Sequence, residues 1–440
     1  MSTAEPIVNV GIITSPALFF EFHGEFICSS NQTLYTGTKK AAFHEGKIDF
    51  EGEFFDELSF NPKDAATAFI RIKDVVIGIQ FHWQRTEDQQ FQGGLKIVTD
   101  GKNLVAINQI GVETYLKSVI ASEMKATSSI ELLKAHAVIS RSWLLAQMEK
   151  SHSIKKQSIH YNPIIQTGDS LIRWYDREDH TLFDVCADDH CQRYQGMIRQ
   201  NQLVSDAVEA TAGEILEYDG FICDARFSKS CGGVTELFEN CWEPVPHPYL
   251  TTLRDDDSDQ TIPDLTDEEN ASQWIRSNPP AFCNTHDPAI LSQVLNQYDQ
   301  ETTDFYRWKI TYTQEELSQL IAERTGIDFG QVLALEPIER GTSGRIVRLK
   351  IVGSKRQLII GKELEIRKAL SKTHLYSSAF VVDTHDVRDG IPQRFEIIGA
   401  GWGHGVGLCQ IGAAVMGAKG YDYQAILKHY FREAAIVKRY

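Results

Sequence analysis

The sequence predicts an α+β fold, with strands and helices concentrated in different stretches of the chain. Residues 1–105 read mostly as strands, helical spacing begins near Glu113, and strands alternate with helices from residue 306 onward. The chain has 440 residues, enough for two to four domains at about 100–200 residues each. Apolar residues make up 42% and charged residues 24%, the composition of an ordinary globular protein with a sizeable core.

The charge balance argues against one class of partner. Lys and Arg number 44 against 60 Asp and Glu, so the formal net charge is −16. Because contacts to phosphates need a concentrated basic face, we expect no nucleic acid among the partners. The sequence contains no apolar run of about 18 residues, so it predicts no membrane-spanning segment.

The apolar N-terminal stretch differs from a signal peptide. It lacks a basic region at its start, and Pro6, Pro16 and Glu21 interrupt it. We therefore predict a first strand over Ile7–Ile13. On this interpretation an export signal is absent from this sequence, or the protein is not exported by that route.

The rest of the first 105 residues has the pattern of a β-rich region. Runs of Val, Ile and Phe predict strands at Ala68–Ile72, Val75–Phe81 and Leu95–Ile97. We expect this N-terminal region over 1–105 to precede one domain over 106–435. Within that domain, strand-like segments are predicted again from Thr181 to Phe227.

Two consecutive helices are predicted at the start of the second domain. Leu116, Val119 and Ile120 recur at helical spacing, and another helix is expected from about Ile130 to Met148. The run Ser128-Ser129-Ile130-Glu131 fits a capping box, in which a hydroxyl and a carboxylate satisfy free backbone N–H groups.

Residues 253–300 differ in composition from the rest of the chain. Arg254–Asn270 contains eight acids and one base, and Ser277–Pro280 is unsuited to a helix. We predict an exposed insertion or lid here, and of the two a plain solvated loop is favoured.

The last third of the sequence alternates between strands and helices. Strands are predicted at Trp308–Tyr312, Ile346–Val352 and Leu358–Ile360, and helices at Gln314–Thr325, Gly361–Leu370 and Leu408–Ala418. Gly420 suits a helix end, and Asp422 suits the N-cap of a final helix to about Phe431.

One group of Cys and His residues has a spacing that suits a metal ion. His180, Cys186 and Cys191 lie within twelve residues, and His190 is a candidate fourth ligand. Zinc in a closed structural site takes four N or S ligands, although the spacing is not that of a Cys-x2-Cys knuckle. In so long a chain, an even count of eight cysteines does not imply a disulfide framework, and we expect the other six to be buried small apolar residues.

Glu123 is the most informative carboxylate of the sequence. It continues, at helical spacing, the apolar stripe of Leu116, Val119 and Ile120. Desolvation on that face would raise its pKa toward the range of a general acid. The alternative is a partly exposed acid at a helix end, in a salt bridge to Lys125 or Arg141.

Two further features could bind a ligand but have plainer explanations. Arg141 lies among apolar residues of the second helix, where it could hold a sugar or, as the pattern favours, form a structural salt bridge. In Ser228–Thr235, Gly232 and Gly233 would let a ligand approach the backbone while Ser230 and Thr235 offer hydroxyls, but a hairpin turn is equally consistent. Cys231 and Cys409 stay open as nucleophiles, without a recognised motif around them.

Alternating glycines occupy residues 399–407. A dinucleotide loop would need a third glycine where Val406 or Leu408 stands, and no phosphate-loop Lys-Ser/Thr follows. The remaining interpretation is a glycine-lined cleft wall bearing Trp402 and His404, which is a suitable surface for a sugar ring.

Together these segments resemble a known family. Five blocks in order carry the resemblance to the stage II sporulation protein D (SpoIID) family, which includes the amidase-enhancer LytB proteins: Gly111–Ser142, Asp184–Gly196, Ser228–Thr235, Ser343–Arg345 and Gly401–Ala413. They span about residues 95–435. The chain departs from the family's pattern at Lys125, where members often have Pro, and at Cys231, where they often have Asn.

The resemblance implies a peptidoglycan lytic transglycosylase that acts on glycan strands with few or no stem peptides. It implies a catalytic helix pair with β-rich modules around one glycan cleft, Glu123 as the catalytic acid, and zinc on His180, Cys186 and Cys191. The substrate-binding residues it implies are Arg141, Ser230, Gly232, Gly233, Thr235, Trp402, His404 and Gln410. It implies no organic cofactor. Its substrate implies a place in the cell envelope, outside the cytoplasm.

Such a reaction needs one carboxylate, because the attacking group is the substrate's own C6 hydroxyl, whereas an ordinary glycoside hydrolase needs two. Two alternatives remain open. The chain could be a glycan-binding module that activates a cell-wall amidase without cleaving, or a hydrolase with Glu236 or Asp224 as its second carboxylate.

Overall fold

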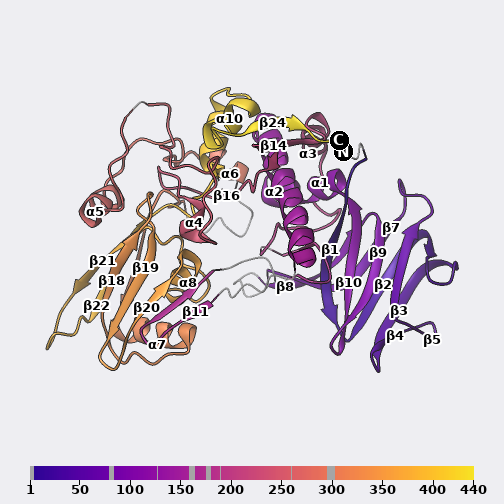
Figure 1. The fold of residues 1–440 in the computed structure, drawn as a ribbon, viewed down its shortest axis with the longest axis horizontal. Helices are drawn as coiled ribbons and strands as arrows, with labels where there is room; N and C mark the ends of the chain where they lie inside the picture. The colour runs from indigo at the N-terminus through magenta and orange to yellow at the C-terminus, as the bar shows by residue number, and fades with distance from the viewer. Residues whose placement is uncertain are drawn as a thin grey trace.

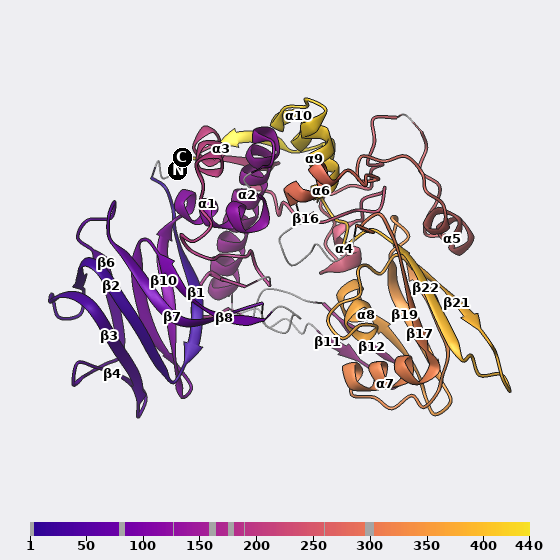
Figure 2. The ribbon, with the colours of Figure 1, turned by 180° about the vertical axis from the view of Figure 1, so that it is seen from behind.

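The structure, a computed structural model, confirms the α+β class. It describes residues 4–78, 84–125, 127–157, 164–174, 180–188, 190–258, 260–294 and 303–440. Figure 1 shows a β-rich N-terminal lobe, a β-rich C-terminal lobe, and helices α1, α2, α9 and α10 between them. Seen from behind, in Figure 2, the two lobes again lie on opposite sides of these helices. Among the described residues, no helix combines the length and the apolar character needed to cross a membrane.

The N-terminal lobe is built on one large, mostly antiparallel sheet. Its main strand order is β13-β1-β10-β9-β6-β2-β3-β4-β5, and β7 joins β8 to β2. The strands are β1 (Ile7–Ser15), β2 (Ala17–Cys28), β3 (Leu34–His44), β4 (Lys47–Phe50), β5 (Glu53–Phe55), β6 (Glu57–Pro62), β7 (Phe69–Ile77), β8 (Arg85–Phe91), β9 (Gly94–Asp100), β10 (Asn103–Gly111) and β13 (Val185–Cys186).

The strands predicted in this region are present, with two differences. The first predicted strand is β1, while the two runs predicted around residues 68–81 form the single strand β7, whose pairing with β8 is irregular between Ile72 and Val75. Residues 79–83, which include the end of the second run, lie outside the described residues. The sheet extends past 105, because β10 pairs along β1 and leads directly into helix α1.

Helices α1 (Val112–Glu123) and α2 (Ile130–Gln157) occupy the positions predicted for the helix pair. The capping box is wrong in its second half. The Ser129 hydroxyl accepts a hydrogen bond from Leu132 N at 3.2 Å, as an N-cap does. The Glu131 carboxylate instead accepts from Lys134 Nζ and from the backbone of Tyr423, both at 2.8 Å, and so joins α2 to the C-terminal helices.

The region from Thr181 to Phe227 contains a helix that the strand-like pattern did not predict. Helix α3 (Gln202–Ala210) begins at Asn201, whose side chain accepts from Val204 N. The strands here are short: β14 (Glu214–Tyr218), β15 (Phe221–Ile222) and β16 (Phe227–Ser228).

The acidic stretch is not the exposed loop that its composition suggested. It contains α5 (Glu268–Arg276) and α6 (Pro288–Val294), and it follows the short helix α4 (Phe238–Cys241). Its apolar side chains are buried, among them Leu265, Trp274, Ile275, Phe282 and Leu291. Most of the described acids lie on the outer face of a packed segment, whereas Asp255 is buried, so composition alone was misleading.

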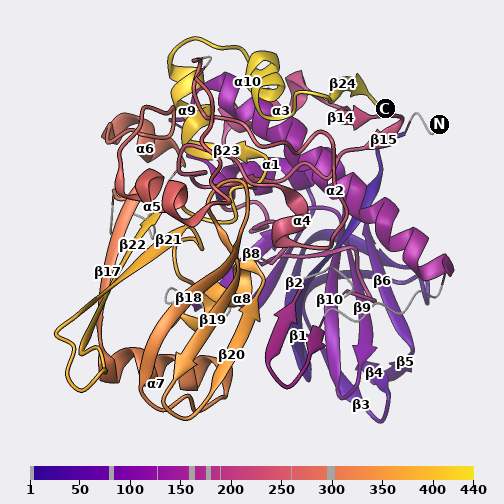
Figure 3. The same ribbon diagram turned by 60° about the vertical axis from the view of Figure 1, so that its left-hand side comes forward.

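The C-terminal lobe holds two sheets, β11-β12-β20-β19-β18 and β17-β22-β21. Figure 3, in which the molecule is turned so that this lobe comes forward, shows them with helices α7 and α8. The elements are β11 (Ile164–Gln166), β12 (Ser170–Arg173), β17 (Arg307–Thr313), α7 (Gln314–Thr325), β18 (Val332–Arg340), β19 (Ile346–Gly353), β20 (Gln357–Gly361), α8 (Glu363–Ala369), β21 (Phe380–His385) and β22 (Arg394–Ala400). The strands and helices predicted here are confirmed, with ends that shift by at most two residues.

The chain closes on the helical region. After β23 (Leu408–Cys409) come α9 (Gln410–Ala418), α10 (Tyr423–Tyr430) and β24 (Ala435–Lys438), which pairs with β14. Asp422 caps α10 as predicted, by accepting from Ala425 N at 2.8 Å. The two ends of the chain meet at the start of α1, where Glu5 accepts from Glu113 N and the Tyr440 hydroxyl donates to the Glu113 carboxylate.

Candidate active site and metal centre

Glu123 is the last residue of α1, and its side chain is half-buried. The apolar stripe that precedes it is fully buried, as predicted. None of the described residues gives the Glu123 carboxylate a hydrogen bond or an ion pair. The salt bridge to Lys125 or Arg141 is therefore not formed in the described part of the chain.

The chain just after Glu123 meets the Ser228–Thr235 block at the end of α6. The carbonyl of Gln293 accepts from Lys125 N and from the Ser128 hydroxyl, each at 3.0 Å. The next carbonyl, that of Val294, accepts from Lys229 Nζ. The segment after Glu123 and the segment that carries Lys229 therefore both bond to the end of α6, close to the candidate acid.

A chain of buried hydrogen bonds runs beside α1 and α2. The Tyr115 hydroxyl donates to Gln192 Oε1 at 3.3 Å, and Gln192 Nε2 donates to the carbonyl of Ser140 at 3.4 Å. The Ser140 hydroxyl lies 3.2 Å from His136 Nδ1, and His136 Nε2 lies 3.1 Å from Gln410 Nε2. These residues connect α1, α2 and the first turn of α9.

The His136 imidazole is neutral in this network, because burial and then the positive charge of Lys229 lower its pKa to about 3. Of the network, only Gln410 was a predicted site residue. His136 and Ser140 are polar residues four apart on the buried face of α2, and that spacing is the signal that could have found them.

Tyr115 is close enough to both Glu123 and the candidate metal ligands for their charges to act on it. Burial raises the pKa of its phenol well above the usual value, and the neighbouring Cys191, Cys186, Tyr194 and Glu123 raise it further. Because the charges of both groups reach this one hydroxyl, the acid and the ligand group lie in the same part of the molecule.

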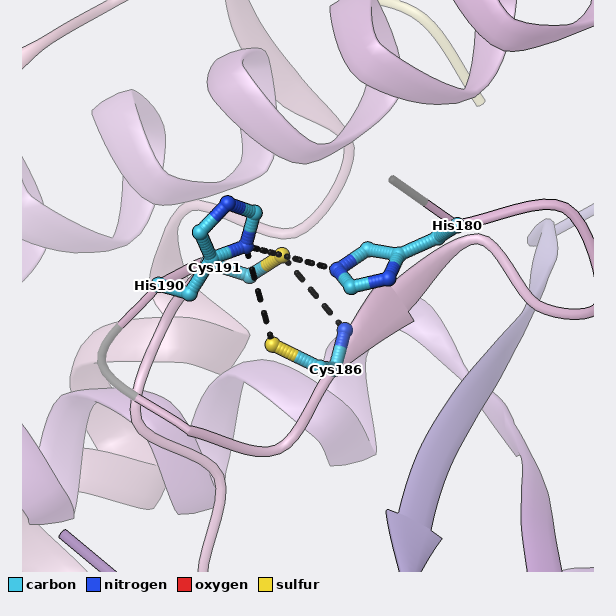
Figure 4. A group of neighbouring side chains, drawn as sticks. All are labelled: His180, Cys186, His190 and Cys191. Atoms are coloured by element: carbon cyan, nitrogen blue, oxygen red, sulfur yellow. Dashed lines mark hydrogen bonds between the residues drawn. The ribbon is translucent and has the colours of Figure 1, made fainter. Parts of the chain in front are cut away.

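The predicted ligands converge, as Figure 4 shows. One ligand atom from each of His180, Cys186, His190 and Cys191 lies within 4.8 Å of all the others. Cys191 Sγ is 3.4 Å from His180 Nε2 and 3.6 Å from His190 Nδ1. Tetrahedral zinc with S and N ligands places them about 3.6 Å apart, so the group fits one zinc ion.

The fold explains why Cys186 is held in this position. Its strand β13 pairs in parallel with β1, and Cys186 N donates to Cys191 Sγ at 3.4 Å. Hydrogen bonding with the Cys191 thiol and with two imidazoles lowers the pKa of Cys186, although burial opposes the effect. The thiolate, which is the form that binds metal, is thereby favoured.

The glycine-rich turn presents two ring side chains at the surface and encloses a buried arginine. Trp402 is partly exposed and stacks on Tyr376 with ring centres 4.1 Å apart, and His404, also partly exposed, packs on Trp242. The glycines themselves face inward: a Cβ at Gly405 would lie 2.5 Å from the Arg345 guanidinium. The alternation of glycines thus makes room for a buried arginine.

Arg345 joins three of the five blocks. It is 1% exposed and donates to the carbonyl oxygens of Gly403 and Cys231, each at 3.1 Å, and to the Ser343 hydroxyl at 3.0 Å. A buried guanidinium bound by several carbonyl groups fixes the relative positions of the loops that supply them. Arg345 belongs to one of the five blocks of the sequence, but its residue pattern predicts no role for it.

Comparison with known proteins agrees with this geometry. Residues 100–218, which contain Glu123, Tyr115, His136 and the metal ligands, match the model of the family described as Stage II sporulation protein. This part of the chain is therefore a domain of the stage II sporulation protein type. Residues 236–407 match a second model, described as a domain of unknown function (DUF8618). Two family models therefore match within the range 106–435, for which a single domain was predicted.

Full-length relatives are distant. The chain is 24% identical to "Stage II sporulation protein D" of Bacillus subtilis, over 75% of this chain and 76% of that protein. It is 25% identical to "Amidase enhancer" of Bacillus subtilis, over 72% of this chain but only 39% of that protein. An uncharacterized protein of Brachyspira hyodysenteriae is 26% identical over 79% of this chain and 72% of its own length.

Within the SpoIID domain, Arg141 has a structural position. Its side chain is 0% exposed, and it donates to both carboxylate oxygens of Glu113, at 2.9 and 2.6 Å, and to the carbonyl of Glu214. The favoured salt bridge is present, with Glu113 as its acid. A guanidinium enclosed in this way has no surface to offer a sugar, which corrects its predicted place beside the substrate.

The other predicted substrate-binding residues divide into two sets. Trp402 and His404 are partly exposed. The buried set consists of Ser230, Gly232, Gly233, Thr235 and Gln410. Thr235, for example, donates to the carbonyl of Thr251 at 2.9 Å. In this conformation the buried set supports the surface around the turn and does not form it.

The two candidate second carboxylates are both engaged. Glu236 is 0% exposed and accepts hydrogen bonds from Asn240, Thr342 and Ser343. Asp224 pairs with Arg226 at 2.7 Å. Neither is free to act as the base or nucleophile of an ordinary hydrolase, so the structure argues against that alternative.

Proposed function

We propose that this protein is a peptidoglycan lytic transglycosylase that cleaves the MurNAc–GlcNAc bond and leaves 1,6-anhydro-MurNAc ends. The observation that carries the proposal is the state of Glu123. It is a half-buried carboxylate with no partner among the described residues, whereas Glu113, Glu236 and Asp224 are held by cations or hydrogen bonds. An acid that must gain and lose a proton during a reaction needs such freedom.

One acid is sufficient for the reaction. Protonated Glu123 would donate its proton to the glycosidic oxygen as the C1–O bond breaks. The resulting carboxylate would accept the proton of the C6 hydroxyl as O6 bonds to C1 and closes the anhydro ring. The carboxyl group ends as it began, and no water is consumed.

The surrounding residues would bind and support the glycan. Trp402, held in a stack by Tyr376, offers an aromatic face for a sugar ring. Arg345 would keep the turn that carries Trp402 in place. His180, Cys186, His190 and Cys191 would hold a structural zinc ion, whose chemistry is to fix the loop beside Tyr115.

A non-catalytic role is the second candidate, because one relative is named amidase enhancer. In that case the same surface would bind glycan strands and bring a cell-wall amidase to them. Both functions require a substrate outside the cytoplasm, so we place the protein in the cell envelope. We propose glycan strands with few or no stem peptides as the preferred substrate in either case.

Product analysis distinguishes these functions. The purified chain is incubated with intact peptidoglycan and with glycan strands from which an amidase has removed the stem peptides. Mass spectrometry then identifies the ends of the fragments. We expect anhydro ends, more of them from the stripped strands, and their loss in Glu123→Gln.

The matched control is Glu209→Gln, an exposed acid on α3 that pairs with Lys117. It should release fragments at the wild-type rate. Reducing ends in place of anhydro ends would contradict the proposed reaction. If no fragments form and an added amidase works faster in the presence of the chain, the non-catalytic function is supported instead.

A further inference from the structure

A second group of possible metal ligands lies away from Glu123 and is fully buried. One ligand atom from each of Cys231, Asp255, Cys283 and Cys409 lies within 4.8 Å of all the others. Their exposed fractions are 2%, 0%, 1% and 0%. From the sequence, these three cysteines were expected to be buried small apolar residues, with Cys231 and Cys409 also left open as nucleophiles.

The separations suit a single ion. Cys231 Sγ and Cys283 Sγ are 3.6 Å apart. Zinc–sulfur bonds of about 2.3 Å place tetrahedral thiolates about 3.8 Å from one another. Three thiolates and a carboxylate form a complete set of four ligands, as a closed structural zinc site requires, and thiolates select zinc over the harder divalent cations.

The residues around the group orient its ligands. Cys283 N donates to Asp255 Oδ2 at 3.0 Å, and the Tyr430 hydroxyl donates to Asp255 Oδ1 at 2.7 Å. Cys231 N donates to Cys409 Sγ at 3.2 Å. Hydrogen bonds of this kind to metal ligands orient them and disperse their charge.

Two features of α9 admit this arrangement. Cys409 is its N-cap residue, so its thiolate would lie at the positive end of the helix dipole. Gly412 leaves the space that Asp255 occupies, since a Cβ there would lie 2.6 Å from Asp255 Oδ1.

We propose that Cys231, Asp255, Cys283 and Cys409 bind one structural zinc ion. The ion would join three segments: the loop after β16, the acidic stretch, and the start of α9. These segments also position Lys229 and the end of α6 near Glu123. Binding would release the thiol protons to solvent and would stabilise the fold by linking residues 52 and 178 positions apart.

Metal analysis tests the site independently of activity. The full chain is purified with a reductant present, and zinc is counted by mass spectrometry in the wild type and in Cys186→Ser/Cys191→Ser. That variant removes the first ligand group, and we expect it to retain one zinc ion per chain. Cobalt substituted into it should show thiolate-to-metal charge-transfer absorption and the visible bands of a tetrahedral site.

Cys409→Ser in the same background should lose the remaining ion and the cobalt bands. As a control, Cys28→Ser in that background alters a buried cysteine of strand β2, and it should retain the remaining zinc ion and the cobalt bands. If Cys409→Ser fails to fold, the double variant with its four buried ligands intact still decides the question. A folded double variant without zinc, with iron in its place, or with a Cys231–Cys283 disulfide would overturn the proposal.

Discussion

The two ends of helix α1 carry glutamates in opposite situations. Glu113, in the first turn, accepts from Arg141, the Tyr440 hydroxyl and Gly213 N, and its side chain is 16% exposed. Glu123 ends the helix, eleven residues after Val112, where a fully buried stripe begins. Its carboxylate has no partner among the described residues.

The difference separates stability from chemistry on one helix. At Glu113 the acid balances a buried cation and ties both chain ends to the helix, so its charge must be fixed. At Glu123 nothing fixes the charge, so the carboxyl is free to exchange a proton with a substrate. The same residue type therefore serves the fold at one end and, on our proposal, the reaction at the other.

The largest expected effect is on activity at Glu123. Glu123→Gln keeps the shape of the side chain but removes the proton that the reaction needs. General acid–base catalysis contributes about 10²–10⁴-fold, so we expect the release of anhydro fragments to fall by about that factor. The rate is measured by mass spectrometry under single-turnover conditions.

Folding and binding should be unchanged in this variant. Its midpoint of unfolding in urea should match the wild type, because no described residue depends on the Glu123 charge. Sedimentation with insoluble peptidoglycan should also match. Wild-type fragment release by a folded Glu123→Gln protein would remove the contrast between the two glutamates.

The opposite result is expected at Glu113. Glu113→Ala leaves the Arg141 guanidinium buried and unpaired, and breaking a buried ion pair costs about 3–5 kcal/mol of unfolding free energy. We expect a loss of about 3 kcal/mol, because Glu113 retains some exposure. Urea unfolding followed by fluorescence measures it, and the folded fraction should retain its activity per molecule.

An exposed pair supplies the control for this loss. Glu209→Ala removes the partner of Lys117 on the surface, where a salt bridge is worth about 0–1 kcal/mol. A Glu113→Ala protein no less stable than Glu209→Ala would mean that the Arg141 pair does not hold the helix.

Removing the metal from the His180, Cys186, His190 and Cys191 group should have an intermediate and local effect. Chelation, or Cys191→Ser, should loosen the loop that carries His180, Cys186 and His190 without unfolding the sheets. We expect faster amide hydrogen exchange in residues 180–188 and 190–195, and lower activity where Tyr115 borders the loop. Unchanged exchange after complete chelation would contradict a structural metal at this loop.

The sequence predicted helix ends correctly where the contacts that fix them are made by residues close together in the chain. Helix α7 has its predicted ends because the Thr313 and Glu316 side chains cap its first turn and Gly326 ends it with φ 71°. Asp422 set the start of α10 in the same way. Helix α3 also has an N-cap residue, Asn201. The helix has only nine residues and lies among short strands, so the strand-like pattern of the surrounding sequence hid it.

Long-range contacts account for what sequence could not supply. The convergence of Cys231, Cys283 and Cys409 depends on packing across 178 residues, and periodicity says nothing about it. The glycines of residues 401–407 were interpreted as a ligand surface, but Arg345, which is remote in the chain, fills the space beside Gly401 and Gly405. Arg141 was correctly expected to form a salt bridge, but only the fold identifies Glu113 as its partner.

The smallest expected effect is the pH dependence of the Glu113 pair. Burial opposes ionisation there, but hydrogen bonds and the charge of Arg141, with help from Tyr440 and Gly213, lower the pKa of Glu113 below its usual value. A depressed folded-state pKa means that the pair contributes its full stability above the unfolded pKa of about 4.3 and loses it as the pH falls through the folded-state pKa.

The stability difference between wild type and Glu113→Gln should thus be constant from pH 7 to about pH 5 and shrink below about pH 4. Glu209→Gln should show no such narrowing. A difference that stays constant into the acid range would mean that Glu113 titrates alike in both states, and that the two ends of α1 differ less than their contacts imply.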